Sequence, residues 1–377
     1  MHKRLLTVSI LFVSIFILGA CSVDKEPISP NDTFLAPATA SLDLQKSKTF
    51  VQRSNTNEGE IVIHGQAGAT FQTAKIKFTN RVGGQSTDWQ NLNVDVANKQ
   101  FSGKYKLIGG GYYAQIQLIA DGKVVTDGLL PTTINVGEVF AVIGHSISEG
   151  QEPYVILDYD RTWCQIKLWP PLIEQKIYFN PSFWGRVAEY TKKRLNVPVM
   201  IFNTGQGGST SVQWGKSAYG EQFEEHDFYN WRQRQPYARF EQRLVNEIKQ
   251  TGLRAIFVVH GENDYWTAEN DIVYFTGRYI QKTRELLNHP QLPFLIAKSN
   301  AGQDKPEQIK VRRAQKRMLQ EIPNTFEGAN LEFIKDGGMR WDGVHYNFAA
   351  LEIAAIQWKE VLTPLFFQVS KPFTPAN

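Results

Sequence analysis

The segment GHSISEG, residues 144–150, contains the residue types of a nucleophilic site, because two serines and a histidine directly follow the apolar run VFAVI. A serine hydroxyl attacks a carbonyl carbon efficiently only when a neighbouring base takes its proton, and that base needs a partner that fixes its tautomer. From residue types alone, either Ser146 or Ser148 could be the nucleophile, or neither.

The segment WDGVHYN, residues 341–347, supplies a base and its partner in one loop. Asp342 precedes His345 by three residues, so one turn of backbone can place the carboxylate against the imidazole Nδ1 and leave Nε2 pointing outward. A lone D-x-x-H motif is also typical of a helix cap beside a packed histidine. The motif therefore indicates catalysis only in combination with other segments.

Two further segments contain donors suited to the negative oxygen that forms when an ester carbonyl is attacked. Asn263 of GEND carries a side-chain amide directly after a predicted strand, and Gly208 of NTGQGGST presents a backbone N–H that no side chain shields. Taken singly, a glycine-rich loop can merely turn the chain, and an asparagine beside an aspartate can be a cap.

The elements that must position these residues alternate along the chain. From residue 139 onward, strand-like and helix-like segments follow one another, which predicts a parallel sheet with helices on both faces. In such sheets, sites lie outside the carboxyl ends of the strands. The loops that come after predicted strands are residues 144–150, 203–210, 261–266 and 339–347, and we expect them to converge.

The chain before residue 137 has a different pattern. Residues 57–136 predict a small antiparallel β-sandwich domain, because short alternating runs such as AKIKFTN and YYAQIQLIA are separated by turn residues. Residues 21–56 are rich in Ser, Thr, Pro, Asn and Asp, which predicts a flexible tether. The α/β domain then spans residues 137–377.

The first twenty residues, 1–20, are typical of a signal peptide, with a basic start and an apolar stretch that ends in LGAC. That ending resembles a bacterial lipobox, which implies cleavage before Cys21 and lipidation of that cysteine. The alternative is an ordinary transmembrane anchor, but the apolar run is shorter than the roughly 20 residues that a span needs. We therefore expect a lipid-anchored protein of the bacterial cell envelope. Ser22 permits an outer-membrane location, either periplasmic or surface-exposed.

Composition and missing motifs exclude several classes of protein. Hydrophobic residues make up 42% of the chain and charged residues 21%, as in ordinary globular proteins. The formal net charge is +4 and no basic block is present, so no nucleic-acid partner is expected. Histidines and carboxylates do not cluster at zinc-ligand spacings, and we expect neither a metal nor another cofactor. The absence of a G-x-S-x-G elbow argues against an α/β-hydrolase.

Together, the four loop segments resemble the sequence blocks of the SGNH (GDSL-like) hydrolase superfamily and, within it, the sialate O-acetylesterase-like carbohydrate esterases. GHSIS resembles block one, NTGQGGST block two, GEND block three and DGVH block five, all in family order. The resemblance extends from about residue 137 to the C-terminus. It implies a three-layer α/β/α domain of the flavodoxin-like type.

Carried over to this sequence, the resemblance makes Ser146 the nucleophile, His345 the base and Asp342 the residue that orients the base. It makes the backbone N–H groups of Ser146 and Gly208 and the side chain of Asn263 the donors of the oxyanion hole. Gly208 is preferred over its neighbour because it lies five residues after the first residue of block two, which is the family spacing.

Two residues beside the nucleophile need separate interpretation. His145 stands where the wider family usually has aspartate and the sialate esterase group usually has glutamine, so its role is open between a polar brace for the loop and a substrate contact. Ser148 is predicted to form hydrogen bonds within the loop.

The resemblance implies a serine esterase that removes O-acetyl groups from carbohydrates, with an O-acetylated glycan as its partner. Aromatic side chains beside the motif loops could stack on sugar rings or could pack the loops together: Trp214, Tyr265, Trp266, Trp341 and Tyr346. The segment 151–183 is predicted to form one wall of the cleft, and the β-sandwich could bind glycan or merely brace the enzyme. The alternatives are a lipase- or thioesterase-type SGNH hydrolase and an inactive surface lipoprotein that binds glycans.

Overall fold

The computed structural model describes residues 40–150, 158–168, 182–224, 229–298, 306–334 and 338–375. The expected signal peptide, Cys21 and most of the 151–183 segment lie outside these ranges. The chain divides into residues 1–37 and a second unit, residues 38–377. No helix in the described ranges is both long enough and apolar enough to span a membrane.

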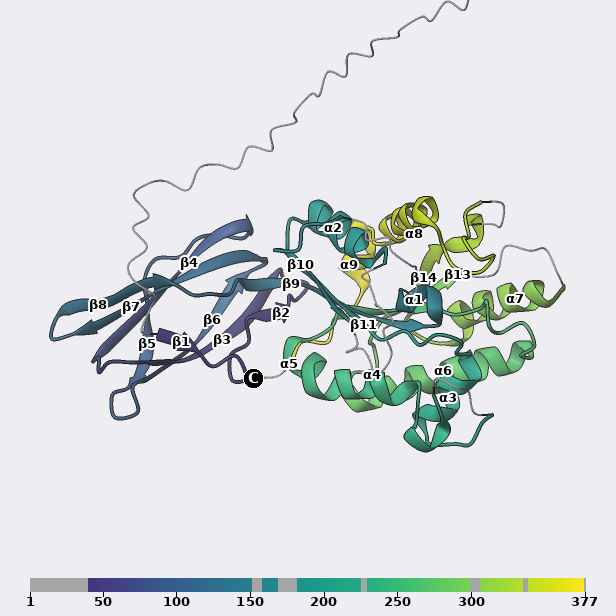
Figure 1. Cartoon of the computed structure of the whole chain (residues 1–377), viewed down its shortest axis with the longest axis horizontal. Coiled ribbons are helices and arrows are strands. Elements are labelled where there is room, and N and C mark those ends of the chain that lie inside the picture. Colours follow the sequence, from purple (N-terminus) through teal and green to yellow (C-terminus); the bar gives the residue numbers. More distant parts are fainter. Residues whose placement is uncertain are drawn as a thin grey trace, which may run out of the picture. The chain divides into compact units, whose positions relative to one another are not determined.

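The first part of this unit is built from antiparallel strands (Figure 1). They are β1 (Ala40–Leu42), β3 (Glu58–Ala67), β4 (Thr73–Gly83), β5 (Gln90–Asp95), β6 (Gln100–Ile108), β7 (Gly110–Ala120) and β8 (Lys123–Leu129). Their order is β1-β3-β6-β5-β4-β7, and β8 pairs with β7. Side chains alternate between core and surface, as in β4, where Ala74, Ile76 and Phe78 are buried. This confirms the predicted antiparallel strands.

The second part is a parallel sheet. Its strands are β9 (Ile134–Gly144), β10 (Cys164–Leu168), β11 (Val199–Asn203), β12 (Ala255–Val259), β13 (Phe294–Lys298) and β14 (Thr325–Asn330). They pair in the order β10-β11-β9-β12-β13-β14, all in parallel. Without β10, this is the flavodoxin-like strand order. In this order, successive strands are added on one side of the first strand, β9, and then on its other side. β10 lies within the segment 151–183 that the sequence predicts to form a cleft wall, and its five residues add an edge strand to the sheet.

Helices cover both faces of the parallel sheet (Figure 1). They are α1 (Ser146–Glu149), α2 (Trp184–Leu195), α3 (Ser211–Ala218), α4 (Tyr237–Arg243), α5 (Lys249–Thr251), α6 (Glu269–Leu287), α7 (Pro306–Glu321), α8 (Phe348–Val361) and α9 (Pro364–Val369), with short turns η1 (Trp231–Gln233), η2 (Leu244–Ile248) and η3 (Leu331–Phe333). One core contains side chains of α2, α8 and α9, and the other contains side chains of α3, α4, α6 and α7. The predicted three-layer fold class is therefore confirmed.

Strand β9 belongs to both parts of the structure. Its first residues pair with β7 and with β2 (Phe50–Gln52), while its later residues pair with β11 and β12. Because strands of both parts pair with β9, the two parts share this strand. All eleven of its residues are buried.

The prediction of a flexible tether over residues 21–56 is wrong for residues 40–56. This stretch contains β1 and β2, and Phe50 and Val51 are buried. A strand of three residues is too short to produce a recognisable period in the sequence. Its pairing with β9 depends on contacts that only the folded chain makes.

A buried carboxylate strengthens this attachment. Glu138 of β9 is inaccessible to solvent and accepts hydrogen bonds from Gln52 Nε2 (2.9 Å), Arg53 Nε (2.6 Å) and Arg254 Nε (2.8 Å). Arg254 also donates to Asn55 Oδ1 (2.5 Å). Because buried charges are tolerated when paired and hydrogen-bonded, this cluster holds residues 52–55 against the α/β part.

Candidate active site

The candidate nucleophile lies where β9 ends and α1 begins. Gly144 has a φ of 147°, and a Cβ at this position would lie 2.2 Å from the carbonyl oxygen of Val259. Only glycine fits this close approach of two strands. The turn places Ser146 at the first position of α1, where it is 7% exposed and its hydroxyl forms no hydrogen bond with any described residue.

Ser148 is held inside the same loop, as predicted. Its Oγ donates to the carbonyl oxygen of His145 (2.6 Å), and its own carbonyl accepts a hydrogen bond from Trp184 Nε1 (2.9 Å). Ser148 is fully buried. Of the two serines of the segment, only Ser146 therefore has a hydroxyl that is free to react.

The loop before α8 holds the candidate base and its partner in direct contact. Asp342 Oδ2 lies 2.6 Å from His345 Nδ1, while Oδ1 accepts hydrogen bonds from the backbone N–H groups of Val344 (2.9 Å) and His345 (2.7 Å). Burial raises the pKa of Asp342, but these hydrogen bonds outweigh burial and hold the pKa below its usual value. The carboxylate therefore stays ionised and fixes the ring.

The other ring nitrogen of His345 is available. Nε2 is buried and has no hydrogen-bond partner among the described residues, so no hydrogen bond joins it to Ser146 Oγ. Burial lowers the pKa of His145 and raises the pKa of Glu262, and a charge on the His345 ring makes a smaller contribution that lowers each of them. The ring therefore lies within electrostatic range of the residues that directly precede Ser146 and Asn263. Hydrogen bonds between catalytic groups are often long in the absence of substrate.

Donors for an oxyanion come from three loops. The N–H of Gly207 donates to Glu149 Oε2 (2.6 Å), whereas the N–H of Gly208 forms no hydrogen bond with a described residue. Gly208 is also exposed and has a φ of 73°. Asn263 Nδ2 donates one hydrogen to Ser209 O (3.1 Å), which orients the amide and leaves its second hydrogen free.

Hydrogen bonds join the first three loops. Gln206 N–H donates to the carbonyl of Gly144 (2.9 Å), and Asn203 Nδ2 donates to the carbonyl of Glu149 (3.2 Å). Asp264 accepts from both the N–H and the hydroxyl of Ser211 (2.9 Å each), which ties the third loop to the start of α3. Burial raises the pKa of Asp264 to about 6.

The fourth loop is connected by a buried ion pair that the sequence analysis missed. Arg340 Nη2 lies 2.8 Å from Glu262 Oε1, and the guanidinium also contacts the carbonyls of Ile334 (3.2 Å) and Val344. The sequence contains one indication of a role for these residues, because Glu262 directly precedes Asn263 and Arg340 directly precedes the segment WDGVHYN. Nothing in their spacing along the chain, however, predicts that they meet.

The structure divides the flanking aromatic residues into two groups. Of the two roles considered for Trp214, the structure favours packing of the loops, because its side chain is fully buried and its Nε1 donates to Ser209 Oγ (2.9 Å). Tyr346 is also fully buried. By contrast, Trp266 is 88% exposed and Trp341 is 53% exposed. Tyr265 is half-buried.

Trp341 lies against the candidate base. Its ring is nearly parallel to that of His345, with centroids 6.0 Å apart and an interplanar angle of 22°. Its backbone N–H donates to the carbonyl of His345 (3.0 Å). One face of the imidazole thus lies beside an indole that is itself half open to solvent.

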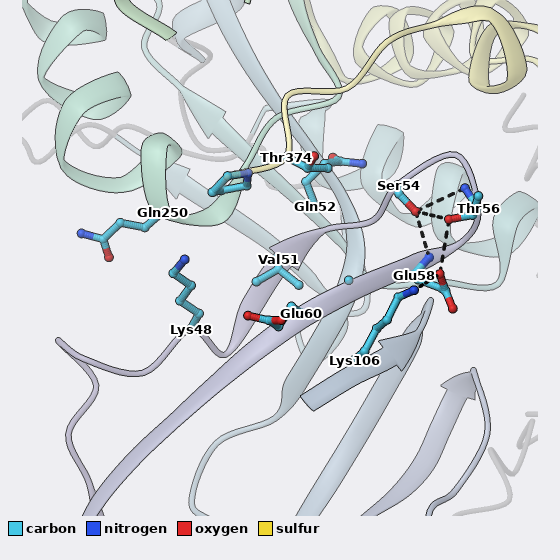
Figure 2. A pocket seen from close by; sticks show the side chains of 12 residues that line it. Lys48, Val51, Gln52, Ser54, Thr56, Glu58, Glu60, Lys106, Gln250 and Thr374 are labelled. Atoms are coloured by element: carbon cyan, nitrogen blue, oxygen red, sulfur yellow. Dashed lines mark hydrogen bonds and ion pairs between the residues drawn. The ribbon is translucent and has the colours of Figure 1, made fainter. Parts of the chain in front are cut away.

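Two polar hollows of about 340 Å³ each lie elsewhere. Figure 2 shows the first, which is lined by residues of β2 and β3 together with Lys106, Gln250 and Thr374. The second is lined by residues of β3, β5 and β6. None of the lining residues belongs to the four loops, so neither hollow contains the candidate catalytic residues.

Comparison with known proteins bears on the same part of the chain. Residues 175–352 match a family model described as carbohydrate esterase, sialic acid-specific acetylesterase. The matched region contains Gly208, Asn263, Asp342 and His345, while Ser146 lies before it. No curated protein sequence matches the chain.

Several solved structures are similar in part. A carbohydrate acetylesterase from Xanthomonas citri is 16% identical, with a TM-score of 0.48 over 85% of this chain and 75% of that one. A protein from Arabidopsis thaliana is 15% identical, with a TM-score of 0.43 over 62% of this chain and 98% of that one. An acetyl xylan esterase from the rumen bacterium Butyrivibrio proteoclasticus is 12% identical, with a TM-score of 0.36 over 86% and 98%. All three likenesses are weak. Slightly under half of the chain, residues 175–352, thus matches the carbohydrate esterase family of sialic acid-specific acetylesterases.

Proposed function

We propose that this protein is a serine esterase of the SGNH type that removes O-acetyl groups from carbohydrates. The observation that carries the proposal is the contact of 2.6 Å between Asp342 and His345 Nδ1, which leaves a buried, unpartnered Nε2 in the part of the chain that matches the esterase family. An oriented imidazole with a free nitrogen is what a serine nucleophile requires.

The proposed reaction proceeds through an acyl-enzyme. Ser146 Oγ attacks the acetyl carbonyl carbon while His345 Nε2 takes the hydroxyl proton. The resulting oxyanion accepts hydrogen bonds from the N–H groups of Ser146 and Gly208 and from the Asn263 amide. Collapse of this intermediate releases the sugar hydroxyl, which receives the proton from His345, and leaves acetyl-Ser146. Water, deprotonated by His345, then releases acetate.

The surroundings of the site support a glycan substrate. Trp341 exposes aromatic surface beside the candidate base, and Trp266 exposes aromatic surface three residues after Asn263. Sugar rings have apolar C–H faces that pack well on such rings. Tyr265 lies between the Asn263 loop and Trp266 in sequence and is the third candidate contact.

Acetate release from a panel of O-acetylated glycans tests this proposal, with Ser146→Ala as the matched variant. We expect release by the wild-type protein and its loss in Ser146→Ala, with unchanged thermal unfolding. Turnover that persists in Ser146→Ala would contradict the mechanism. Faster hydrolysis of long-chain than of acetyl esters would instead favour a lipase- or thioesterase-type enzyme, and binding without turnover would indicate an inactive glycan-binding protein.

For the location of the protein, we propose a lipid anchor on Cys21 in the bacterial cell envelope. The supporting pattern is the apolar stretch that ends in LGAC. Expression of the full chain and of Cys21→Ser, followed by membrane fractionation and mass spectrometry of the N-terminal peptide, tests this. An unlipidated N-terminal peptide in the wild-type protein would refute it.

A further inference from the structure

His145 occupies the position directly before the candidate nucleophile, and its buried ring lies beside Glu262 and beside the ring of His260, whose centroid is 6.1 Å away. Its Nδ1 lies 3.4 Å from the backbone N–H of Ile147 and accepts from it. Nδ1 is then unprotonated, so in a neutral ring the proton is on Nε2. Burial, together with the charges of Arg340 and His345, lowers the pKa of His145 to about 3. The ring is therefore neutral under all ordinary conditions.

The protonated nitrogen of His145 faces Glu262. His145 Nε2 and Glu262 Oε2 lie 3.4 Å apart, and neither atom has a well-aligned hydrogen-bond partner in the described part of the chain. Both side chains are almost completely buried. Because an unpaired buried polar atom is costly, this donor and this acceptor are each other's natural partners.

Glu262 continues the chain of contacts to the fourth loop. Its other oxygen, Oε1, pairs with Arg340 Nη2 at 2.8 Å. Arg340 in turn contacts the carbonyls of Ile334 and Val344, and it stacks over the ring of Tyr346 with its guanidinium carbon 4.9 Å from the centroid. The guanidinium supplies a counter-charge for the buried carboxylate. Burial raises the pKa of Glu262, and Arg340 counteracts part of this rise.

Each member of this chain lies within two residues of a residue of the proposed mechanism. His145 precedes Ser146, Glu262 precedes Asn263, and Arg340 lies two residues before Asp342. We propose that His145, Glu262 and Arg340 form a buried strut that sets the relative positions of the nucleophile, the oxyanion amide and the base. In this strut His145 is a neutral hydrogen-bonding spacer and a positioning residue. It transfers no proton and touches no substrate.

This inference rests on the esterase function proposed above, and its test compares two substitutions at one position. His145→Gln keeps an acceptor for the Ile147 N–H and a donor toward Glu262, whereas His145→Leu keeps the approximate volume and neither group. The control is Thr283→Val on α6, which removes a different buried hydroxyl that donates to Tyr279 O (2.7 Å).

The assay is hydrolysis of an acetyl ester, with active sites counted by a serine-reactive fluorophosphonate and mass spectrometry of the Ser146 adduct. We expect His145→Leu to lower kcat per counted site by about 10- to 100-fold with little change in KM, since small displacements of catalytic groups cost that much. His145→Gln should stay within a few-fold of the wild type, and Thr283→Val should retain the wild-type kcat. Wild-type kcat in His145→Leu, or equal losses in the two His145 variants, would overturn the strut.

A second measurement does not depend on esterase activity. Nitrogen-15 spectra of histidine-labelled protein report the charge and tautomer of each ring, and the His145 signals are those absent from His145→Gln. We expect a neutral ring with the proton on Nε2, even at about pH 5, where an ordinary histidine is charged. A His145 ring that titrates near its usual range would refute the strut. Lack of acetyl-ester hydrolysis by the wild-type protein would instead refute the proposed function.

Discussion

Replacement of Glu138 by glutamine tests how firmly residues 50–55 are joined to the parallel sheet. Glu138 is fully buried and accepts four side-chain hydrogen bonds, one from Gln52, one from Arg53 and two from Arg254. The side chains of Arg53 and Arg254 are only 12% and 1% exposed. Glu138→Gln preserves the shape of the side chain but leaves two buried guanidinium groups without a counter-charge.

The expected loss of stability follows from that burial. Removal of one partner from a buried ion pair costs about 3–5 kcal/mol, because the remaining charge stays desolvated. We expect Glu138→Gln to lower the free energy of unfolding by this amount, measured from the midpoint of urea unfolding monitored by tryptophan fluorescence. The control is Lys46→Ala, which removes the solvent-exposed pair with Asp43 and should leave the midpoint nearly unchanged.

Two results would refute this reasoning. A midpoint for Glu138→Gln as close to the wild type as that of Lys46→Ala would mean that solvent reaches the cluster. A large loss of acetyl-ester hydrolysis at temperatures where the variant is folded would mean that Glu138 acts on the site, although its partners all lie at the opposite end of β9 from Ser146.

Three further predictions concern the site. Asn263→Ala should lower kcat about 10²- to 10³-fold with little change in KM, because an oxyanion donor acts mainly in the transition state; a change in KM alone would contradict this. Trp341→Ala should raise KM for glycan substrates more than for 4-nitrophenyl acetate, because only the glycan has a sugar ring to pack on the indole. Equal changes in KM for the two substrates would contradict this. For Asp264, the folded-state pKa of about 6 lies above the ordinary aspartate value of 3.8. The folded state therefore binds the proton more tightly, and its free energy of unfolding falls by about 3 kcal/mol as pH rises between these values. Urea unfolding of Asp264→Asn between these pH values should therefore show a smaller fall than the wild type, and parallel curves would contradict this.

Much of the architecture could be predicted from local patterns. The alternation of strand-like and helix-like segments after residue 139 predicted the three-layer fold, because burial of parallel strands produces continuous apolar runs. The contact between Asp342 and His345 could be predicted for a similar reason, since three residues of backbone suffice to bring the carboxylate to the ring.

Other features depend on contacts between distant parts of the chain. The sequence places both Trp214 and Trp341 within a few residues of a motif segment, yet of the two only Trp341 has exposed surface, because the core beneath α3 encloses the indole of Trp214. β2 was missed because a three-residue strand carries no period, and its partner β9 lies more than eighty residues further along the chain.

By itself, the sequence determined which residue types were available at the ends of the strands and which pairs could meet within one turn of backbone. Only the tertiary structure decided that His145, Glu262 and Arg340 meet in a buried chain, that Gly208 rather than Gly207 keeps a free N–H, and that residues 50–55 join the folded unit. The physical reason is the separation along the chain of the residues that interact. Local hydrogen bonds follow from spacing along the chain, whereas burial and long-range ion pairs exist only after the sheet has brought the loops together.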